Sequence, residues 1–403
     1  MKKILNNLST QLLILGAILL LSIALPARAQ VPDPESPSKK ETDKKDRGLD
    51  LEMFAETRIE YTDNVFRLTD YQISWMETND SEDIESGRFK DMDSTSDFII
   101  GPSIGIKFGS ESPLGGELEL TSWIRYNYHT KNDKSGFPEG RIRLENSIGE
   151  KGALTLEGNL LFDYFKKNYI SGVNDTNSNG NIPREERIYS AAIYDEYEAI
   201  AVYEHRVLKE KDKRLSRLDI EPFMGYRYRV HNSTFSNRDL DIFSCGLGMD
   251  MEFISKIDLE IIYQYERVVS PNDEELFLFD ETLSGVDVNK DGEIRSNAPI
   301  VSNIDRSSKR HTIKINPSIK LTKEASLYLE YRRRISTYTS DNQLDIEHYN
   351  VEAVRQKFNL GFEYDFSKAW TGELEYGRTD DHDEEDGDYL QNNFQIKIEY
   401  NFL

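Results

Sequence analysis

The chain has 403 residues, carries a formal net charge of -23 at pH 7, and contains 37% hydrophobic and 31% charged residues. Its mean hydropathy is -0.64, and no stretch after the first thirty residues is apolar for long enough to form a membrane helix. The acidic balance argues against a nucleic-acid-binding role, and the single cysteine, Cys245, excludes an intrachain disulfide.

The first residues have the pattern of an export signal. Two lysines precede an apolar run over residues 12–25, and the sequence A-R-A follows at 27–29 as a cleavage site. We therefore interpret residues 1–29 as a secretory signal peptide. Residues 30–47 contain three prolines and many charges without an apolar period, which predicts a disordered periplasmic tether.

From residue 48 onward, short segments repeat one pattern, in which apolar side chains occupy every second position. Such alternation is typical of β-strands with one apolar and one polar face. The last segment, N-F-Q-I-K-I-E-Y-N-F, has the length of a tilted strand that crosses a bilayer. The strand within 187–206 alternates least regularly, so we expect its phase to slip at a bulge. The predicted strands cover residues 49–61, 98–108, 118–128, 142–148, 154–164, 187–206, 218–228, 243–251, 257–265, 313–321, 325–331, 358–366, 370–376 and 393–402.

The connections between these segments alternate in length. Every second one is short, as at 112–116 and 149–152, or moderate, at 208–216, whereas the others tend to be longer. Bacterial outer-membrane barrels have an even number of strands, short periplasmic turns and long external loops. For residues 48–403 the sequence therefore predicts an all-β fold, a transmembrane antiparallel up-and-down β-barrel of about fourteen strands in the bacterial outer membrane. The alternative is a soluble, secreted all-β protein, whose turns would have similar lengths at both ends.

Charged residues of both signs dominate the polar faces of these strands, and in a barrel those faces line the lumen. One interpretation is a ladder of ion pairs that rigidifies the barrel. The other is a polar conduit that screens ions or binds hydroxyl-rich sugars. Arginines gather toward the external halves of several strands, where they either pair with the acidic loops or bind carboxylates and phosphates. The residues that we expect to line the lumen are Glu56, Arg58, Glu119, Arg125, Arg141, Arg143, Arg227, Arg229, Glu260, Arg332 and Arg334.

Two connections share the pattern D-x-N-x-[DN]-G-x-I, which resembles the start of an EF-hand calcium loop. In the first, Glu186 stands at the twelfth position, where a bidentate acid belongs, whereas the second has Ala298 there. We expect weak Ca²⁺ binding, stronger in the first loop; the alternative is an Asx-rich turn without metal. The candidate ligands are Asp175, Asn177, Asn179, Asn181 and Glu186 in the first loop and Asp287, Asn289, Asp291 and Glu293 in the second.

Enzyme motifs are scarce. No two of the six histidines stand at metal-ligand spacing on one predicted element, and the G-x-S-x-G sequence of many hydrolases is absent. We therefore expect no catalytic residues and no cofactor other than Ca²⁺. The alternative is a hydrolase that builds a His/Ser/carboxylate site at the barrel rim without a local motif.

The first strand runs into E-Y-T-D-N-V-F-R-L at residues 60–68. D-N-V-F just after the first strand of a barrel of this length resembles the family of outer-membrane β-barrel porins whose members are often found with exopolysaccharide production and export systems. The resemblance implies no catalytic residue, and the matched Asp63, Asn64 and Phe66 are expected to shape the first external turn. The terminal strand resembles the signal read by the outer-membrane assembly machinery, although here Phe402 is penultimate.

These observations predict a porin-like outer-membrane barrel that passes polar solutes or supports exopolysaccharide export. Its expected partners are outer-membrane lipid, the assembly machinery and polysaccharide or polysaccharide-export proteins, but no nucleic acid. The alternatives are an enzyme carried by the barrel and a closed structural or adhesive barrel with Ca²⁺-stabilised external loops.

Overall fold

The computed structural model describes residues 50–78, 89, 92–112, 116–173, 187–210, 214–253, 256–270, 274–277, 300–340, 349, 351–383 and 387–402. The chain divides into two units, Met1–Asp46 and Arg47–Leu403. The predicted signal peptide and tether lie outside the described residues. No helix in the described ranges is long and apolar enough to cross a membrane.

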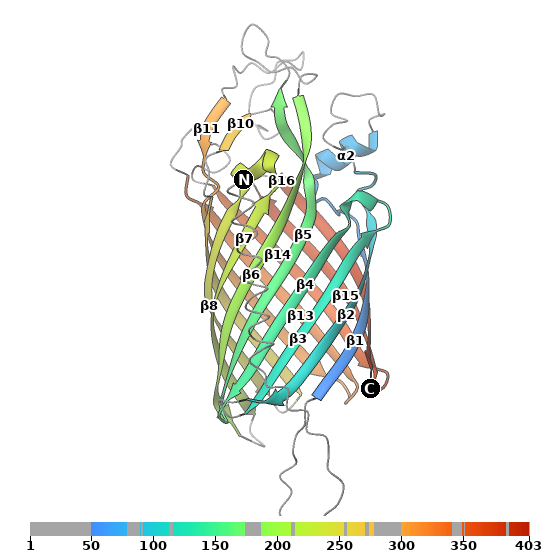
Figure 1. Cartoon of the computed structure of the whole chain (residues 1–403), viewed down its shortest axis with the longest axis vertical. Coiled ribbons are helices and arrows are strands. Elements are labelled where there is room, and N and C mark those ends of the chain that lie inside the picture. Colours follow the sequence, from blue (N-terminus) through green and yellow to red (C-terminus); the bar gives the residue numbers. More distant parts are fainter. Residues whose placement is uncertain are drawn as a thin grey trace, which may run out of the picture. The chain divides into compact units, whose positions relative to one another are not determined.

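The second unit contains a closed antiparallel barrel of fourteen strands, as predicted (Figure 1). Each strand pairs with its neighbours in sequence, β9 lies beside β12, and β16 closes the ring against β1. The barrel strands are β1 (Asp50–Thr62), β2 (Asp97–Glu111), β3 (Glu117–His129), β4 (Phe137–Ile148), β5 (Gly152–Val173), β6 (Arg187–Lys209), β7 (Leu215–His231), β8 (Leu240–Phe253), β9 (Ile257–Val269), β12 (Ser308–Lys320), β13 (Ala325–Tyr338), β14 (Glu352–Asp365), β15 (Trp370–Asp383) and β16 (Gly387–Phe402). A separate two-stranded sheet and three short helices complete the described elements: β10 (Glu274–Phe277), β11 (Ile300–Ile304), α2 (Asp70–Thr78), η2 (Asp133–Ser135) and η4 (Ser233–Arg238).

The terminal strand closes the barrel, as its alternation predicts. β16 pairs with β15 on one side and with β1 on the other, where Phe402 lies opposite Met53 and Asn393 lies opposite Thr62. Because every strand of the ring then has two partners, the sheet has no open edge. The start of β1 and the end of β16 lie at the end of the barrel that carries the short turns (Figure 1).

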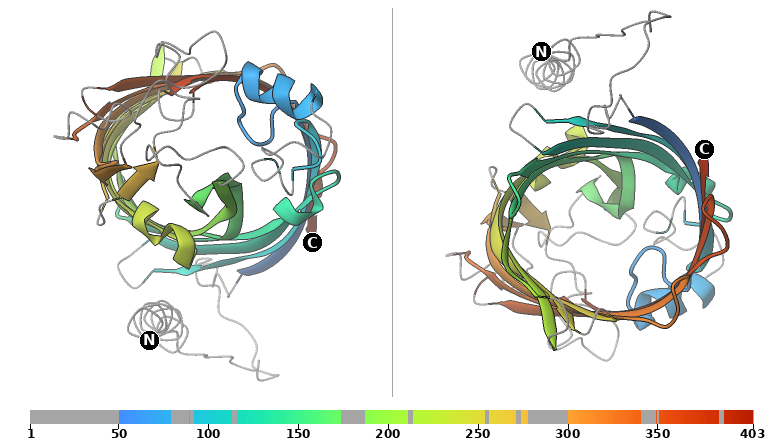
Figure 2. Two further views of the ribbon diagram at one scale, coloured as in Figure 1. Left: turned by 90° about the horizontal axis from the view of Figure 1, so that it is seen from above. Right: turned by 90° about the horizontal axis from the view of Figure 1, so that it is seen from below.

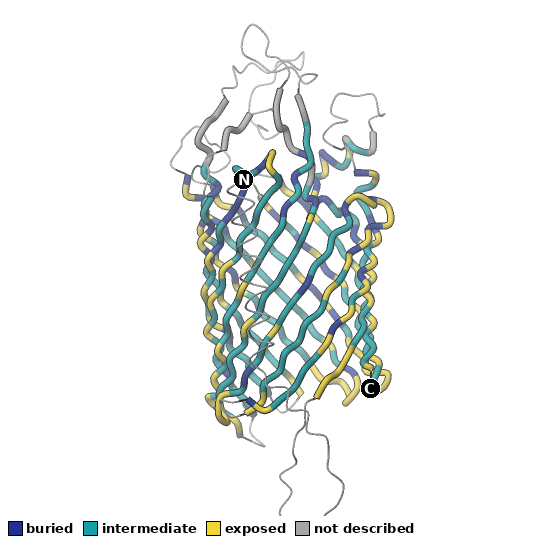
Figure 3. The backbone as a smooth tube through the Cα atoms, in the orientation of Figure 1, coloured by how far each residue is buried: buried dark blue, intermediate teal, exposed yellow. Residues whose placement is uncertain are grey.

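The apolar residues of the alternating pattern lie on the outside of the barrel. In β16 the Phe394 and Ile398 side chains are each 45% exposed, whereas the Lys397 ammonium points inward and lies 3.5 Å from both Glu56 and Glu373. Figure 3 shows the same alternation of exposed and less exposed positions along the other strands. A continuous apolar surface of this kind is stable against hydrocarbon and costly in water. The protein is therefore an outer-membrane barrel and not a soluble all-β protein.

Aromatic side chains mark both ends of this apolar surface. At the short-turn end the Trp370 and Tyr400 ring centroids are 4.6 Å apart, and at the other end those of Tyr61 and Phe98 are 5.0 Å apart. Rings with one apolar and one polar part suit the boundary between hydrocarbon and headgroups. The two bands therefore bracket the part of the barrel that crosses the membrane.

Two interior glycines let aromatic rings of neighbouring strands lie against the sheet. A Cβ atom added to Gly105 would overlap the Phe54 ring, and one added to Gly361 would overlap the Tyr328 ring. Pairs of this kind pin the strand register and permit the sheet to curve into a barrel.

The predicted irregularity near the sixth strand is confirmed and is more extensive than expected. The register of β6 against β7 shifts between Arg206 and Leu208, and the register of β5 against β6 shifts at three places, the first between Leu161 and Tyr164. Most of the extra residues are therefore in β5 and not in β6. Bulges bend a strand and increase its twist.

Several elements at the long-loop end differ from the sequence prediction. β5 continues to Val173 and β15 to Asp383, where the sequence predicted ends at 164 and 376. The connection between the predicted strands 49–61 and 98–108 contains α2, and its Phe66 joins a buried apolar cluster. These strand ends extend past the hydrocarbon layer, so the alternation that reveals a strand is not enforced there.

Candidate functional site

Ion pairs within and between strands cover the interior wall. Arg125 contacts Glu56 and lies 3.0 Å from Glu139, and Arg227 lies 2.8 Å from Glu198. These partners belong to barrel strands and not to the acidic loops, so the ion-pair interpretation holds for this part of the wall. Further pairs join Arg58 to Glu60 and Glu139, Lys107 to Glu119, Arg141 to Glu157, Arg143 to Glu145, Arg229 to Glu196, Lys314 to Glu260 and Glu330, and Arg332 to Glu330.

The D-N-V-F-R stretch after β1 folds into the barrel, and the blue segment between β1 and α2 lies inside the ring of strands in both views of Figure 2. Asn64 is only 1% exposed. Its Oδ1 accepts a hydrogen bond from the Leu68 N–H at 2.7 Å, and its Nδ2 donates to the carbonyls of Leu68 at 2.6 Å and Leu390 at 3.2 Å. The Asp63 carboxylate accepts bonds from the backbone and side-chain N–H groups of Asn392, both at 2.7 Å. The motif thus shapes the first external turn and fastens it to β16.

Apolar contacts hold the same segment from within the barrel. Phe66 and Phe165 belong to one buried cluster and meet edge to face, with ring centroids 5.8 Å apart. Phe165 lies just beyond the first bulge of β5, where Asp163 has a φ of +52°. The outer ends of β5 and β6, in green, consequently lean over the opening of the barrel (Figure 2). The segment after β1 and the outer ends of β5 and β6 therefore both narrow the external opening of the barrel.

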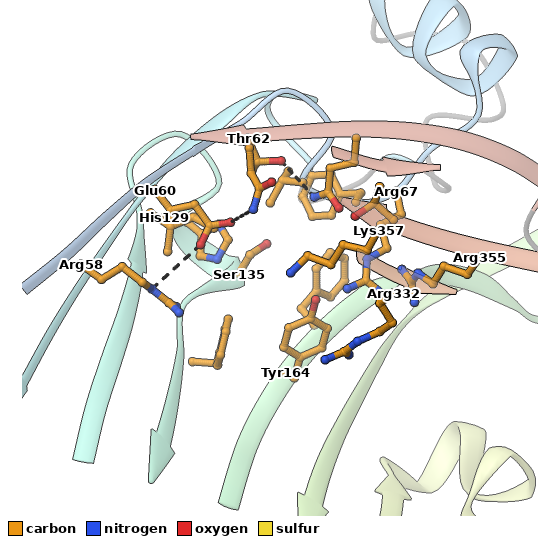
Figure 4. Close-up of a pocket in the computed structure, with 18 of the residues that line it drawn as sticks. Arg58, Glu60, Thr62, Arg67, His129, Ser135, Tyr164, Arg332, Arg355 and Lys357 are labelled. Carbon is orange, nitrogen blue, oxygen red and sulfur yellow. Dashed lines mark hydrogen bonds and ion pairs between the residues drawn. The ribbon is translucent and has the colours of Figure 1, made fainter. Parts of the chain in front are cut away.

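Arg67 is held in an unfavourable backbone conformation. Its φ is +55°, in the left-handed region that non-glycine residues seldom adopt, and its N–H donates to the Asn64 carbonyl at 3.2 Å. Such a conformation costs about 1–2 kcal/mol for a residue with a Cβ atom. The fastened segment offsets that cost and places the Arg67 side chain in the barrel interior (Figure 4).

These elements enclose a cavity of about 370 Å³ near the external end of the barrel. Figure 4 shows Arg332, Arg355 and Lys357 on one side, Arg58 and His129 on the other, and Tyr164 between them. Nineteen residues line the cavity, and only one of them is a carboxylate, Glu60. The six basic lining residues are Arg58, Arg67, Arg332, Arg334, Arg355 and Lys357. A chain with a large net negative charge therefore contains a positively charged cavity.

The basic side chains of β13 and β14 oppose one another across the strand pair. Arg332 lies opposite Lys357, and Arg334 lies opposite Arg355. Like charges directly opposite destabilise a sheet. Arg355 is partly balanced by Asp381, 3.1 Å from its Nε, whereas Arg334 and Lys357 form no ion pair within 4.0 Å in the described ranges. The buried Nε atoms of Arg332 and Arg334 also have no hydrogen-bond partner there. Positive charge in the cavity is therefore incompletely compensated.

Aromatic, aliphatic and neutral polar side chains form most of the rest of the cavity wall. The ring centroid of Tyr164 lies 4.9 Å from that of Phe137 and 5.0 Å from that of Tyr194. Gln391 contributes an amide, whose Nε2 donates to Thr62 Oγ1 at 3.0 Å. The cavity thus combines cations, rings and amides, a set that suits a charged polar ligand better than an apolar one.

In the described ranges, no group of three or more His, Cys, Asp or Glu residues could hold a metal ion. His129, which lines the cavity, has its Nδ1 3.2 Å from Asp97 Oδ2. The Asp97 carboxylate also accepts the backbone N–H groups of Lys131 and Asn132, so this pair organises the turn after β3. The predicted calcium ligands lie outside the described residues: Asp175, Asn177, Asn179, Asn181, Glu186, Asp287, Asn289, Asp291 and Glu293.

Of the six basic residues of the cavity, Arg58, Arg332 and Arg334 were expected to line the lumen and the other three were not. Arg67 lies in a segment interpreted as a loop, and Arg355 and Lys357 precede the predicted start of their strand at 358. The alternation V-R-Q-K-F before that start was a usable signal, because it continues the inward phase of the strand by two residues.

No protein-family model matches the chain, and no curated protein matches it. Among solved structures, the chain is similar to the outer membrane channel DcaP of Acinetobacter baumannii, with 12% identity, a TM-score of 0.42, and coverage of 88% of this chain and 97% of that one. It is also similar to an anion-selective porin from Comamonas acidovorans (11%, TM-score 0.36, 88% and 99%) and to a bacterial polysaccharide outer membrane secretin (10%, TM-score 0.35, 87% and 98%). The porin-type fold implied by the sequence is confirmed by the strand pairing itself.

Proposed function

We propose that this protein is a porin-type channel that passes polar solutes across the outer membrane. The observation that carries the proposal is the division of side chains on a closed ring of fourteen strands, apolar toward lipid and charged toward the interior. Interior polar groups can replace part of the hydration of a hydrophilic solute, which lowers the cost of its passage past the hydrocarbon layer.

Among polar solutes, the channel favours anions. Six cationic side chains and one carboxylate line the cavity at the external end. A cleft lined by one sign of charge with low-dielectric walls focuses the field and raises the local concentration of the opposite ion. The strand halves nearer the periplasm carry charges of both signs, among them the pairs of Lys107 with Glu119 and of Lys320 with Asp258.

Liposome swelling tests the proposal. Liposomes that contain the purified protein should swell in isotonic solutions of small sugars, and faster still in solutions of small organic anions. Liposomes with heat-denatured protein serve as the control. Swelling no faster than that of the control for every solute would show that the barrel is closed and would favour the structural alternative.

Support of exopolysaccharide export is a second candidate, favoured by the aromatic rings of Phe137 and Tyr164 beside the basic wall of the cavity. Rings and cations together suit a chain of acidic sugars. A strain that lacks the protein should then secrete less polysaccharide while its synthesis continues, and the wild-type gene should restore secretion. Unchanged secretion in the deletion strain would eliminate this candidate.

A further inference from the structure

We propose that the cavity at the external end is a binding site for an acidic saccharide, whose carboxylate, sulfate or phosphate group is held by Arg334 and Lys357 and whose sugar ring lies against Tyr164. The inference rests on the proposed function and names the class of solute that this part of the channel recognises.

The first observation is the arrangement of charge on β13 and β14. Two like-charged pairs, Arg332 with Lys357 and Arg334 with Arg355, lie directly opposite in the sheet. Elsewhere on the interior wall, arginines such as Arg125 have carboxylate partners on nearby strands. Opposed cations destabilise the empty protein, and positions that break a local rule of this kind are expected at functional sites. A bound anion would supply the missing counter-charge.

The second observation is that a separate element adds another cation to the same cavity. Arg67 reaches it from the segment after β1, which Asn64 fastens by hydrogen bonds at both ends of the turn. Arg67 adopts a left-handed φ of +55°, which is unfavourable in free energy for a residue with a Cβ atom. The surrounding contacts hold the residue in this conformation. Forked guanidinium donors match the geometry of carboxylate, sulfate and phosphate groups. Cations from β13, β14 and the inward segment therefore converge on one volume.

The third observation is the position of the single carboxylate. Glu60 lies beside Arg58, with its Oε2 3.9 Å from Arg58 Nε, on the opposite side of the cavity from Arg332 and Lys357 (Figure 4). An anionic group next to β13 and β14 is thus separated from the one carboxylate that lines the cavity, and the nearby Asp381, which does not line it, is already paired with Arg355. The cavity has a cationic side, formed by Arg332, Arg355 and Lys357, and a mixed side, which contains Arg58 and Glu60. This difference gives an entering ligand a preferred orientation.

The fourth observation is the wall between these two sides. The ring of Tyr164 is steadied by Phe137 and Tyr194, with centroids 4.9 and 5.0 Å away, and it lies between the cationic and mixed sides in Figure 4. Aromatic walls with a few placed polar groups are typical of small-molecule sites, and a volume of about 370 Å³ falls in their usual range of about 300–1,000 Å³. A ring with a charged substituent, which is what an acidic sugar offers, uses both features.

Calorimetric titration of the purified, detergent-solubilised protein tests the proposal. The probes are trigalacturonate, neutral maltotriose and inorganic phosphate. We expect trigalacturonate to bind more tightly than either of the others, with an affinity that falls as salt is added. The double variant Arg334→Gln with Lys357→Gln should lose about 100-fold or more in affinity, because it removes two charge-assisted hydrogen bonds.

A matched control removes the same charge at the other end of the barrel, where Lys107 pairs with Glu119 and Lys320 pairs with Asp258. Lys107→Gln with Lys320→Gln should bind trigalacturonate as the wild type does. Thermal unfolding provides a second readout. Because the site variant relieves like-charge repulsion, it should melt at the same temperature as the wild type or higher, whereas loss of a structural role would lower the melting temperature.

Three outcomes would overturn the proposal: equal binding of trigalacturonate and maltotriose, unchanged affinity in the site variant, or phosphate binding as tight as that of trigalacturonate, which would indicate a site for free oxyanions only. Swelling of liposomes separates these results from failure of the proposed function. A protein that passes small sugars but does not bind trigalacturonate contradicts this inference alone, and a protein that passes no solute contradicts the proposed function.

Discussion

Asn64→Ala tests whether the inward segment is held as the structure indicates. The substitution removes three hydrogen bonds of a nearly buried side chain, two to Leu68 at 2.7 and 2.6 Å and one to the Leu390 carbonyl at 3.2 Å. At a net value of about 0.5–1.5 kcal/mol for each bond, the segment should lose about 2–4 kcal/mol of docking free energy. The barrel itself should not unfold, because no ladder hydrogen bond is removed.

Hydrogen exchange at the Leu68 amide measures that loss directly, because Asn64 Oδ1 is its acceptor. A change of about 2–4 kcal/mol corresponds to exchange about 30- to 700-fold faster. The variant should also lose anion preference, since Arg67 would no longer be fixed in the cavity. Asn401→Ala removes one side-chain hydrogen bond, 3.3 Å long, at the other end of β16 and serves as the control. Wild-type exchange at Leu68 in the Asn64 variant would refute the account of this segment.

Three further predictions concern the lipid face, the bulge and the calcium loops. Leu360 is 41% exposed on the outer face. Leu360→Arg should therefore lower the free energy of unfolding, measured by urea titration, by about 2–4 kcal/mol. An equal loss for Glu260→Arg, on the inner face, would show that the two faces are assigned wrongly. Because Asp163 has a φ of +52°, Asp163→Val should lower the free energy of unfolding by about 1–2 kcal/mol, whereas Asp163→Gly should not lower it. Equal melting temperatures for the two variants would argue against the left-handed bulge. Millimolar Ca²⁺ should slow proteolysis at 174–186, with a Kd on the order of 10⁻⁴–10⁻³ M, and Asp175→Ala with Glu186→Ala should abolish this protection; identical cleavage in calcium and in chelator would favour a turn without metal.

The membrane-spanning part of the fold could be predicted because its signal is local. In β16, Phe394 and Ile398 face outward and Lys397 faces inward, as the alternation of the sequence indicates. The hydrocarbon layer enforces that alternation on every strand that crosses it, and closure then requires an even count. Where β5 extends beyond the layer, neither constraint acts, and the prediction ended too early.

The inward segment could not be predicted because its stability comes from contacts distant in sequence. Phe66 packs against Phe165, and Asn64 bonds to the Leu390 carbonyl. Three apolar residues in six show no period that distinguishes a docked turn from a solvated loop. The D-N-V-F motif marked the place, but the direction of the turn depends on the bulge of β5.

The candidate site was predictable only in part, because it depends on which residues of neighbouring strands lie opposite one another. Alternation correctly assigned Arg332 and Arg334 to the lumen, yet it carries no information on which residues face them across the sheet. Their opposition to Lys357 and Arg355 follows from the register of β13 against β14. The register in turn depends on turn geometry and cross-strand packing, so uncompensated charge becomes visible only in the folded barrel.

The reversal potential of single channels in a planar bilayer with a salt gradient tests the central claim most directly. A polar lumen with a basic cavity predicts an open channel whose reversal potential lies toward the equilibrium potential of the anion. The Arg334→Gln, Lys357→Gln variant should move it toward zero. A channel that selects cations, or a correctly folded barrel that conducts no current, would contradict the account.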